Sequence, residues 1–312
     1  MAIYIRRRLS GFIVVLIGVS ILSFTLIVLS KTDPAEAIAL RNAGYVSEEL
    51  VNRIREDLNL NGSVAARYFK WIGGLLTGNL GVSIYSYNPV AQDLKVYFPA
   101  TLALVGLSML WIVLISVPVG LVCTRWKNGI FDQAARGVTI LSICLPTFWL
   151  GFILLLAFAV KLPLFSVVPE PGIKGLLLPS LTLAVPVSGS TIRLFRASLL
   201  GEMNRDYVIY ASARGLSPWR IITRHAMRNA LPPIVTLFCQ YLGYLIAGSA
   251  VVERVFSLKG IGSYLIACIM AVDITTVATC MVIISGVFVL ANLAGDIINR
   301  KLCPWMLREY NA

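Results

Sequence analysis

Six long stretches without a charged residue constrain this chain more than any other feature. Each stretch runs for 18 to 29 residues. A helix needs roughly 20 mostly apolar residues to cross about 30 Å of hydrocarbon, so the stretches predict six transmembrane helices. They lie between Arg8 and Lys31, Lys95 and Arg125, Arg136 and Lys161, Lys174 and Arg193, Arg228 and Glu253, and Asp273 and Asp296.

The composition supports a membrane protein. Hydrophobic residues make up 58% of the 312 residues and charged residues 13%, and the mean hydropathy is +0.82. Soluble domains have about 45–50% apolar and about 25% charged residues. A seventh apolar window, 260–272, is too short to cross and predicts a re-entrant or interfacial helix.

The first stretch has to be distinguished from a signal peptide. The basic start at residues 6–8 suits either, and the sequence AEA at residues 35–37 is similar to a cleavage site. The apolar run is longer than the 7–15 residues of a signal peptide's apolar region. We therefore expect an uncleaved first helix.

The distribution of basic residues predicts the orientation, because Lys and Arg are enriched in cytoplasmic loops. With the N-terminus inside, the inner segments hold 16 Lys and Arg and 5 acids, and the outer segments hold 11 and 10. We expect a multi-pass membrane protein with both termini in the cytoplasm. The topology accounts for the pI of about 9.6, so no nucleic-acid partner is expected.

The one sizeable soluble segment is 31–98, which the orientation places outside the cytoplasm. Ser47 is a predicted N-cap for a helix over 47–61, in which Leu50, Ile54 and Leu58 have helical spacing. A second amphipathic helix is expected over 64–78. The segment either shapes an entrance or forms an inert cap.

The six stretches contain no ionisable Asp, Glu, Lys, Arg or His, only milder polar groups. Ion-coupled secondary transporters, the alternative class, normally need charged groups within the membrane. Most of the polar groups are expected to bond between helices, and a few to line a pathway that proline and glycine allow to bend. The pathway candidates are Ser142, Thr147, Ser188, Thr191, Gln240 and Asn292.

No catalytic motif occurs in the chain. A paired nucleophile and base, HExxH and a phosphate-binding loop are all missing, so the chain is not expected to be an enzyme or to hydrolyse a nucleotide. The six cysteines have no CxxC spacing, and none falls in 31–98. They are expected to pack as small hydrophobic residues, with no metal site.

The stretch YASARGLSPWRIITRHAMRNALPP, residues 210–233, holds four arginines and the chain's only histidine. Asp206 is expected to cap a short helix, and Gly215 suits the position past a helix end where positive φ is needed. Ser217 and Pro218 are a helix-start signal. Arg220, Arg224 and Arg228 would then share one face, and span five would open at Leu231.

Positive-inside bias and binding of anionic headgroups each explain the basic charge of this stretch. Neither requires a sharp turn between two short helices. A compact basic turn with an apolar side is better suited to a groove on a partner protein.

This stretch resembles the cytoplasmic loop of binding-protein-dependent ABC import permeases, and more closely that of the dipeptide/oligopeptide/nickel branch. The resemblance covers nearly the whole chain, including residues 68–83, LPTFW at 145–149 and GSAVVERVFSLKGIG at 248–262. Ile209, Tyr210 and Ala211 stand where the general loop pattern has Glu-Ala-Ala. Lys259 replaces a common proline and Asn79 a common aspartate. These changes bear on the substrate subgroup.

The resemblance implies an all-α integral membrane protein of the type I ABC importer kind, with six transmembrane helices and an extracytoplasmic helical segment between the first two. The expected segments are 1–30 for the N-terminal end and helix 1, 31–98 outside, 99–302 for a five-helix core with the coupling loop 200–230, and 303–312 for a cytoplasmic tail.

The resemblance also implies partners: a second homologous permease, two ABC ATPase subunits that bind ATP and Mg, and an extracytoplasmic substrate-binding protein. The chain itself would need no cofactor. The cargo would be nickel or a metal chelate, which we favour slightly, or a short peptide. The residues expected to contact an ATPase subunit are Tyr210, Ala211, Arg214, Gly215, Leu216, Ser217, Pro218, Trp219, Arg220 and Arg224. Within this set the arginines would meet acidic residues, and Leu216, Pro218 and Trp219 would form an apolar plug.

Overall fold

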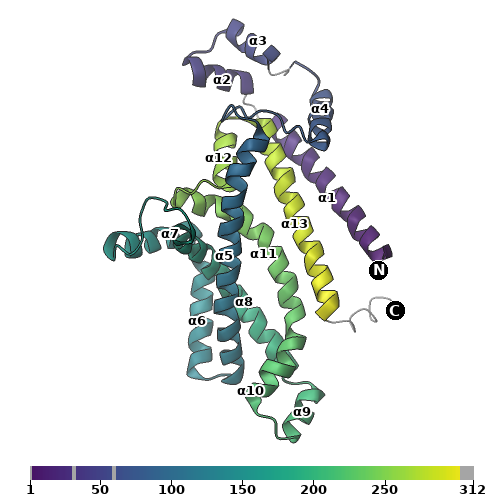
Figure 1. Ribbon diagram of the computed structural model, residues 1–312, viewed down its shortest axis with the longest axis vertical. Helices are drawn as coiled ribbons and strands as arrows, with labels where there is room; N and C mark the ends of the chain where they lie inside the picture. The colour runs from purple at the N-terminus through teal and green to yellow at the C-terminus, as the bar shows by residue number, and fades with distance from the viewer. Residues whose placement is uncertain (1, 30–32, 58–60, 303–312) are drawn as a thin grey trace. The chain divides into compact units, whose positions relative to one another are not determined.

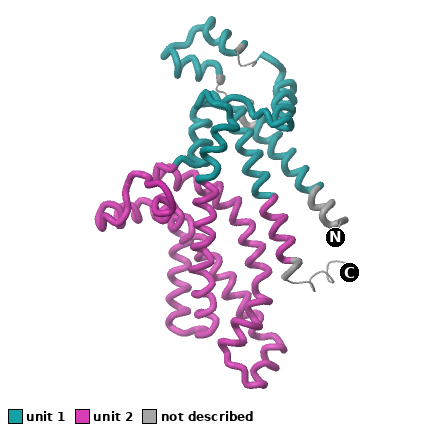
Figure 2. Tube along the Cα trace, in the orientation of Figure 1, with its two compact units in different colours: residues 1–100, 259–289 teal, residues 101–258, 290–312 magenta. Residues whose placement is uncertain are grey.

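The computed structural model describes residues 2–29, 33–57 and 61–302, which divide into two compact units (Figure 2). Unit 1 comprises residues 1–100 and 259–289, and unit 2 comprises 101–258 and 290–312. The sequence-based segments divide the chain differently, because residues 259–289 group with the first hundred. The predicted tail, 303–312, lies outside the described residues.

Helices form every named element, and an isolated β-bridge joins Val82 to Pro89. Unit 1 contains four helices from the first part of the chain and one later helix, together with the first turns of α5 and most of α13 (Figure 1). These elements are α1 (Ala2–Val28), α2 (Pro34–Ala43), α3 (Glu48–Asp57), α4 (Val64–Thr77), α5 (Val90–Arg125), α12 (Ile261–Met270) and α13 (Ile274–Leu302).

Unit 2 contains the remainder of α5 and the elements that follow it along the chain. Its closest helix packing joins α8 to both α6 and α11. The elements are α6 (Ile130–Cys144), α7 (Thr147–Leu155), the π-helix η1 (Leu156–Lys161), α8 (Ile173–Glu202), α9 (Asp206–Ala213), α10 (Pro218–Arg220), the π-helix η2 (Ile221–Ala226) and α11 (Met227–Val255).

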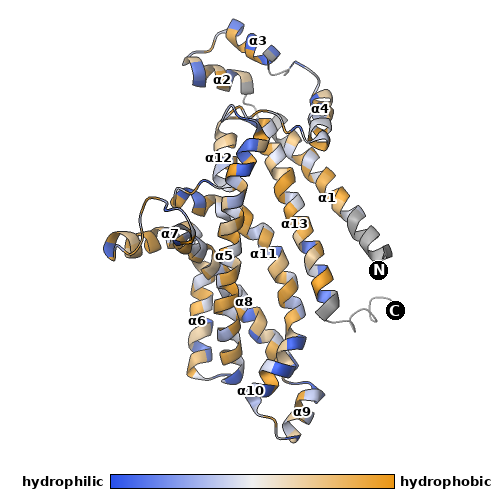
Figure 3. Ribbon diagram, viewed as in Figure 1, coloured by the Kyte–Doolittle hydropathy of each residue, from blue (hydrophilic) through white to orange (hydrophobic). Residues whose placement is uncertain are grey.

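The apolar stretches coincide with the long helices, which are coloured largely orange in Figure 3. Within the described residues, four helices are long and apolar enough to cross a membrane: Val90–Arg125, Ile173–Glu202, Pro218–Val255 and Ile274–Asn299. A bent pair, α6 with α7 and η1, is a fifth candidate. The first stretch falls on α1, in which the described side chains of Ser10–Thr25 form an apolar helix. The seventh window forms α12, as a short helix was predicted to do.

The third predicted span is bent at Pro146, one of the prolines expected to interrupt the apolar stretches. The two halves of this span meet at an angle of 102°. Leu145, between them, has extended backbone (φ −75°, ψ 125°), and Pro146 follows it. Proline disfavours helical backbone in the preceding residue, so α6 ends at Cys144. The prolines of the other spans do not break their helices: Pro179 and Pro186 lie inside α8.

The 31–98 segment has the two helices that were predicted and one that was not, and Leu58 of the first predicted helix lies outside the described residues. Ser47 Oγ accepts from Leu50 N at 3.3 Å before α3, and α4 ends at Gly78, which has φ +80°. The helix α2 was missed, although Asp33 and Pro34 form a start signal of the same kind as Ser217 and Pro218. Asp33 accepts from Ala35 N and pairs with Arg55 of α3.

Two buried aspartates organise the loop that precedes α5 in unit 1. Asp273 accepts from Ser83 Oγ and from Ile84 N, each at 2.7 Å. Asp93 accepts from Tyr264 Oη at 2.7 Å and from Ser86 Oγ. These carboxylates hold residues 83–86 against α12 and the start of α13.

A buried ion pair joins α6 to α8 in unit 2. Arg196 donates from Nε to Asp132 Oδ1 at 2.6 Å and from Nη2 to Oδ2 at 2.7 Å. Asp132 is fully buried, and its Oδ2 also accepts from Asn128 N at 2.9 Å. The bidentate geometry gives both carboxylate oxygens a hydrogen-bond donor. It thereby offsets the cost of burying the charge in apolar surroundings.

We expect Arg196→Met to cost about 3–5 kcal/mol of stability, because it leaves Asp132 buried without its main partner. The matched control is Arg53→Met, which removes an exposed pair with Glu49 and should leave stability nearly unchanged. The measurement is the thermal unfolding midpoint of each purified variant in the same detergent. Equal midpoints for the two variants would show that the buried pair contributes no more to stability than the exposed pair.

Candidate functional site: a basic turn between two helices

The turn that joins α9 to α10 has the predicted construction. Gly215 has φ +75°, a left-handed conformation that favours glycine. Leu216 N donates to Ala211 O at 3.3 Å, which closes the end of α9. Ser217 Oγ accepts from Arg220 N at 3.4 Å, and Pro218 occupies the first helical position. The chain therefore reverses sharply between the two helices.

Two details of the predicted loop are wrong. Asp206 is the first residue of α9, and the preceding Arg205 occupies the cap position without a side-chain capping bond. The second short helix is not separate from span five, because α10, η2 and α11 form one continuous run, Pro218–Val255. This run passes through Pro232 and Pro233. Membrane helices tolerate such prolines because neighbouring groups satisfy the freed carbonyls.

The inner side of the turn is packed. Val208 and Ala211 of α9 are buried against Ile221 of η2, and Leu216 and Tyr207 pack against this cluster. The Tyr207 hydroxyl donates to Glu202 Oε2 at 2.7 Å, which ties α9 to the end of α8. Burial raises the pKa of Tyr207, so the hydroxyl remains protonated as a donor. Two of the predicted contact residues, Ala211 and Leu216, thus support the turn from within.

A second cluster connects the turn to the core of unit 2. Phe195 and Leu199 of α8 are buried with Ile222 and Ala226 of η2. Phe195 also packs closely on α5, where a Cβ added at Gly120 would lie 2.6 Å from its ring. The neighbouring residue in α8 is Arg196, which binds Asp132. The segment after the turn therefore packs on the helix that carries the buried ion pair.

The outer side of the turn combines aromatic and cationic groups. Tyr210 is 68% exposed and Trp219 is 45% exposed. The other predicted contact residues on this side are also exposed, namely Arg214, Gly215, Ser217, Pro218, Arg220 and Arg224. Within the described part of the chain, the ion pairs leave Arg214, Arg220 and Arg224 without an acidic partner.

Sequence reasoning missed one member of this surface. Ile209 is 63% exposed beside Tyr210. The signal in the sequence was a large apolar residue outside the apolar stretches, in a short helix with a polar end. Exposed Ile209, Tyr210 and Trp219, in one short segment with exposed arginines, give it a composition typical of a protein-binding surface.

The pathway candidates divide into packed and accessible residues. Ser142, Ser188 and Thr191 are buried. Ser142 Oγ donates to Thr139 O at 2.9 Å, and Thr191 Oγ1 donates to Val187 O at 2.9 Å. Thr147 and Asn292 are half-buried, and Gln240 is exposed. The structure thus places the first three within helix packing and leaves Thr147, Gln240 and Asn292 partly accessible.

Glu253 is a further residue that sequence reasoning missed. It is 1% exposed and lies inside α11, although the charge pattern made it the boundary of span five. Thr101 Oγ1 donates to its Oε1 at 2.5 Å, and Ser249 Oγ donates to the same atom at 3.0 Å. An acidic residue directly at the end of an apolar stretch was the signal. The helix extends past it, so the carboxylate joins α11 to α5.

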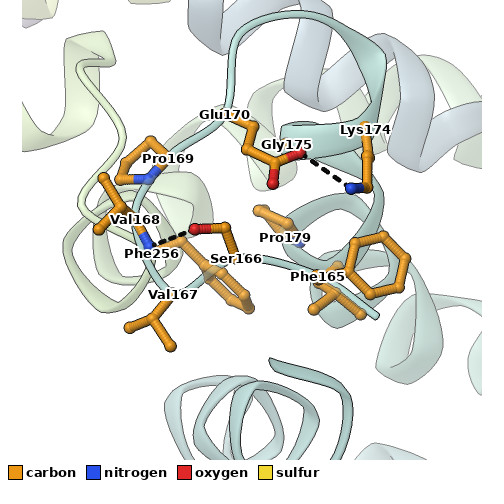
Figure 4. A pocket seen from close by; sticks show the side chains of 11 residues that line it. Phe165, Ser166, Val167, Val168, Pro169, Glu170, Lys174, Gly175, Pro179 and Phe256 are labelled. Carbon is orange, nitrogen blue, oxygen red and sulfur yellow. Dashed lines mark hydrogen bonds and ion pairs between the residues drawn. The ribbon is translucent and has the colours of Figure 1, made fainter. Parts of the chain in front are cut away.

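A small hollow in unit 2 is lined by residues of the 165–179 segment and by Phe256 (Figure 4). Lys174 Nζ lies 3.2 Å from Glu170 Oε2 at its rim, and Ser166 Oγ accepts from Val168 N at 3.1 Å. None of the predicted site residues lines it. Among the described residues, no three His, Cys, Asp or Glu side chains gather where they could hold a metal ion.

Comparisons with known proteins agree with this architecture. Residues 116–308 match the family model "Binding-protein-dependent transport system inner membrane component", and residues 1–105 match the model of its N-terminal part. The chain belongs to this family. It is the membrane permease of a binding-protein-dependent ABC importer, and the ATPase is a separate subunit. Such a permease works with an ATPase and a substrate-binding protein.

Curated relatives match the chain over almost its full length. A probable peptide ABC transporter permease protein of Sinorhizobium fredii, y4tP, is 34% identical over 97% of this chain and 99% of the relative. The glutathione transport system permease protein GsiC of Escherichia coli K12 is 31% identical over 96% and 97%. The probable D,D-dipeptide transport system permease protein DdpB of the same strain is 31% identical over 96% of each chain.

A solved structure shows the fold. An inward-facing structure of the MetNI methionine ABC transporter matches 69% of this chain and 98% of its own chain, with a TM-score of 0.58 at 21% identity. The predicted all-α fold of the type I ABC importer kind is confirmed, as is the predicted membership of the dipeptide/oligopeptide/nickel branch.

We expect Gly189→Ala to weaken the packing of α6 on α8. An added Cβ would lie 2.3 Å from Ser142 Oγ and 2.8 Å from Thr139 O. Such overpacking costs about 1–3 kcal/mol. The matched control is Gly137→Ala on α6, where an added Cβ meets nothing within 4 Å.

Thermal unfolding of the purified variants measures this difference. Gly137→Ala should match or slightly exceed the parent, because alanine is the better helix former. If Gly189→Ala unfolds at the same temperature as Gly137→Ala, Ser142 and Thr139 move aside. The contact at Gly189 then does not fix the packing of α6 on α8.

Proposed function

We propose that this permease imports a short peptide. The three relatives described above are named for peptides, glutathione and a dipeptide. The described residues contain no cluster of metal-binding side chains, which gives no structural support to a metal site in the chain. Nickel or a metal chelate, which the sequence favoured slightly, stays a prediction that the cargo experiment below addresses.

The outer side of the α9–α10 turn carries the proposal for energy coupling. We propose that Tyr210, Pro218 and Trp219 fill an apolar cleft on an ATPase subunit while the exposed arginines meet acidic residues around it. Ile209 extends this apolar surface. ATP and Mg bind to the ATPase subunits and not to this chain.

The inner side of the turn supplies the route for movement. Because Ile221 and Ile222 are buried beneath the turn, a displacement of the turn shifts η2 and the helices that η2 packs against. Phe195 and Leu199 carry this displacement into α8. We propose that ATP-driven closure of the ATPase subunits acts through these contacts to switch the permease between inward-open and outward-open states.

The proposed assembly has four membrane-associated subunits and one external partner. This chain pairs with a second homologous permease, and two ATPase subunits lie below. A substrate-binding protein docks on the side of the 31–98 segment. The distribution of Lys and Arg supports cytoplasmic termini. Of the pathway candidates, Thr147, Gln240 and Asn292 are proposed to contact cargo, because their side chains are not fully buried.

We expect Gly215→Val to uncouple ATP hydrolysis from transport while membrane insertion stays intact. A β-branched residue is strongly disfavoured at φ +75°, so the turn must rearrange although the space around it is open. The matched control is Gly201→Val near the end of α8, which also meets open space but lacks positive φ. Uptake and ATPase activity of the reconstituted complex measure the effect. Normal uptake by Gly215→Val would contradict the docking role.

We expect the cognate binding protein to stimulate ATP hydrolysis by the reconstituted complex when it is loaded with a short peptide. The experiment compares a dipeptide and a tripeptide with nickel ions and a nickel chelate in parallel reactions. Stimulation by the peptides alone supports peptide import. Stimulation only by nickel ions or the nickel chelate would identify a metal cargo in place of a peptide. An absence of stimulation in every reaction would contradict the importer mechanism.

A further inference from the structure

One side of α4 is attached to α1 and α13 within unit 1. Ser20 and Tyr68 share a hydrogen bond of 2.8 Å between their hydroxyl groups. Phe24 stacks on Trp71 with ring centroids 5.7 Å apart. Trp71 Nε1 donates to Thr279 Oγ1 of α13 at 3.0 Å, in a buried contact. These contacts hold α4 against residues 20–24 of α1.

The two sides that flank this contact differ in character. Phe69 is 69% exposed and Leu76 is 81% exposed. Seven residues apart, they lie on one side of the helix together with Ala65. Lys70 and Thr77, each one position further along, are exposed on the other flank. Tyr68 and Trp71 lie between the flanks and face inward. The helix therefore has an apolar flank and a polar flank on either side of its attachment.

The part of α1 that contacts α4 also exposes apolar residues. Beside the Ser20 and Phe24 contacts, Ile21 is 47% exposed and Leu22 is 62% exposed on α1. Exposed apolar residues within a charge-free transmembrane stretch are suited to contact with lipid. Phe69 directly follows Tyr68, which bonds to Ser20 of α1, so one occupant accounts for both surfaces.

The depth of α4 fits the edge of the bilayer. Phe24 lies seven residues before Lys31, the first charged residue after the apolar stretch. From Phe24 to Val28, the last residue of α1, the helix rises about 6 Å. Amphipathic helices lie about 5–10 Å into the boundary between headgroups and acyl chains. Tyr and Trp, which α4 supplies as Tyr68 and Trp71, are enriched at this level.

We propose that α4 is an interfacial helix that binds the lipid bilayer through Phe69 and Leu76 while Lys70 and Thr77 face the aqueous side. The bilayer would then fix the position of α4, and the Trp71 bond would fix the outer part of α13 at the same depth. This inference rests on the membrane location of the family and is independent of the cargo and of the coupling turn.

Site-directed spin labels test the proposal in the full chain, assembled with its partners in lipid nanodiscs. Single cysteines replace Phe69, Leu76, Lys70 and Thr77 in turn, so each apolar position has an adjacent polar control. Cys144, Cys239 and Cys303 are first changed to serine, whereas Cys123, Cys268 and Cys280 are fully buried and remain. Power saturation compares the accessibility of each label to oxygen, which concentrates in lipid, and to a water-soluble nickel chelate.

Labels at positions 69 and 76 are expected to be reached mainly by oxygen, and labels at 70 and 77 mainly by the nickel chelate. Greater access of the nickel chelate to 69 and 76 would place this flank in water and overturn the proposal. Low access of both reagents to 69 and 76 would show that a protein subunit covers the flank, which also overturns it. If a substituted chain fails to assemble, tryptophan at position 69 with brominated lipids is the second measurement, and a lack of quenching beyond the parent level counts against lipid contact.

Discussion

Hydrocarbon cannot solvate a charge or an unpaired backbone group, and the rest of the structure follows from that constraint. The constraint explains the six charge-free stretches and the helical form of the long apolar elements. It also explains how the buried carboxylates are held. Asp132 binds Arg196 in a two-pronged pair, and Glu253 accepts from two hydroxyl groups. In unit 1, Asp273 accepts from a side chain and from backbone N–H groups. Each acid joins segments that are distant in the sequence.

The coupling turn shows how one short segment combines two requirements. Its inner residues, such as Ala211 and Ile221, bury apolar surface and so fix its shape. Its outer residues, such as Tyr210 and Trp219, leave apolar surface exposed among arginines. Exposed groups of this kind gain from association with a partner. The turn can therefore be held rigidly against the permease core while its outer surface binds another subunit.

Local patterns predicted local features well. The turn at Gly215, the cap at Ser217 and the helix start after Ser47 are each specified by neighbouring residues, so one sequence is enough to find them. Features that depend on contacts across the chain were missed. Nothing near Asp132 in the sequence indicates that Arg196 is its partner. Pro146 bends its span, whereas Pro186 does not bend α8. This difference depends on how neighbouring helices satisfy the freed carbonyl groups.

The sequence by itself determined the class of the protein, the positions of its apolar stretches, its expected orientation and the construction of the coupling turn. Hydrophobic length, charge bias and turn chemistry act over short distances, so these features are present in the linear pattern. The tertiary structure alone decided which side chains face inward. It buried Leu216 partly within the turn and left Phe69 exposed on α4. Burial depends on which helices meet, and that arrangement results from packing across the whole chain.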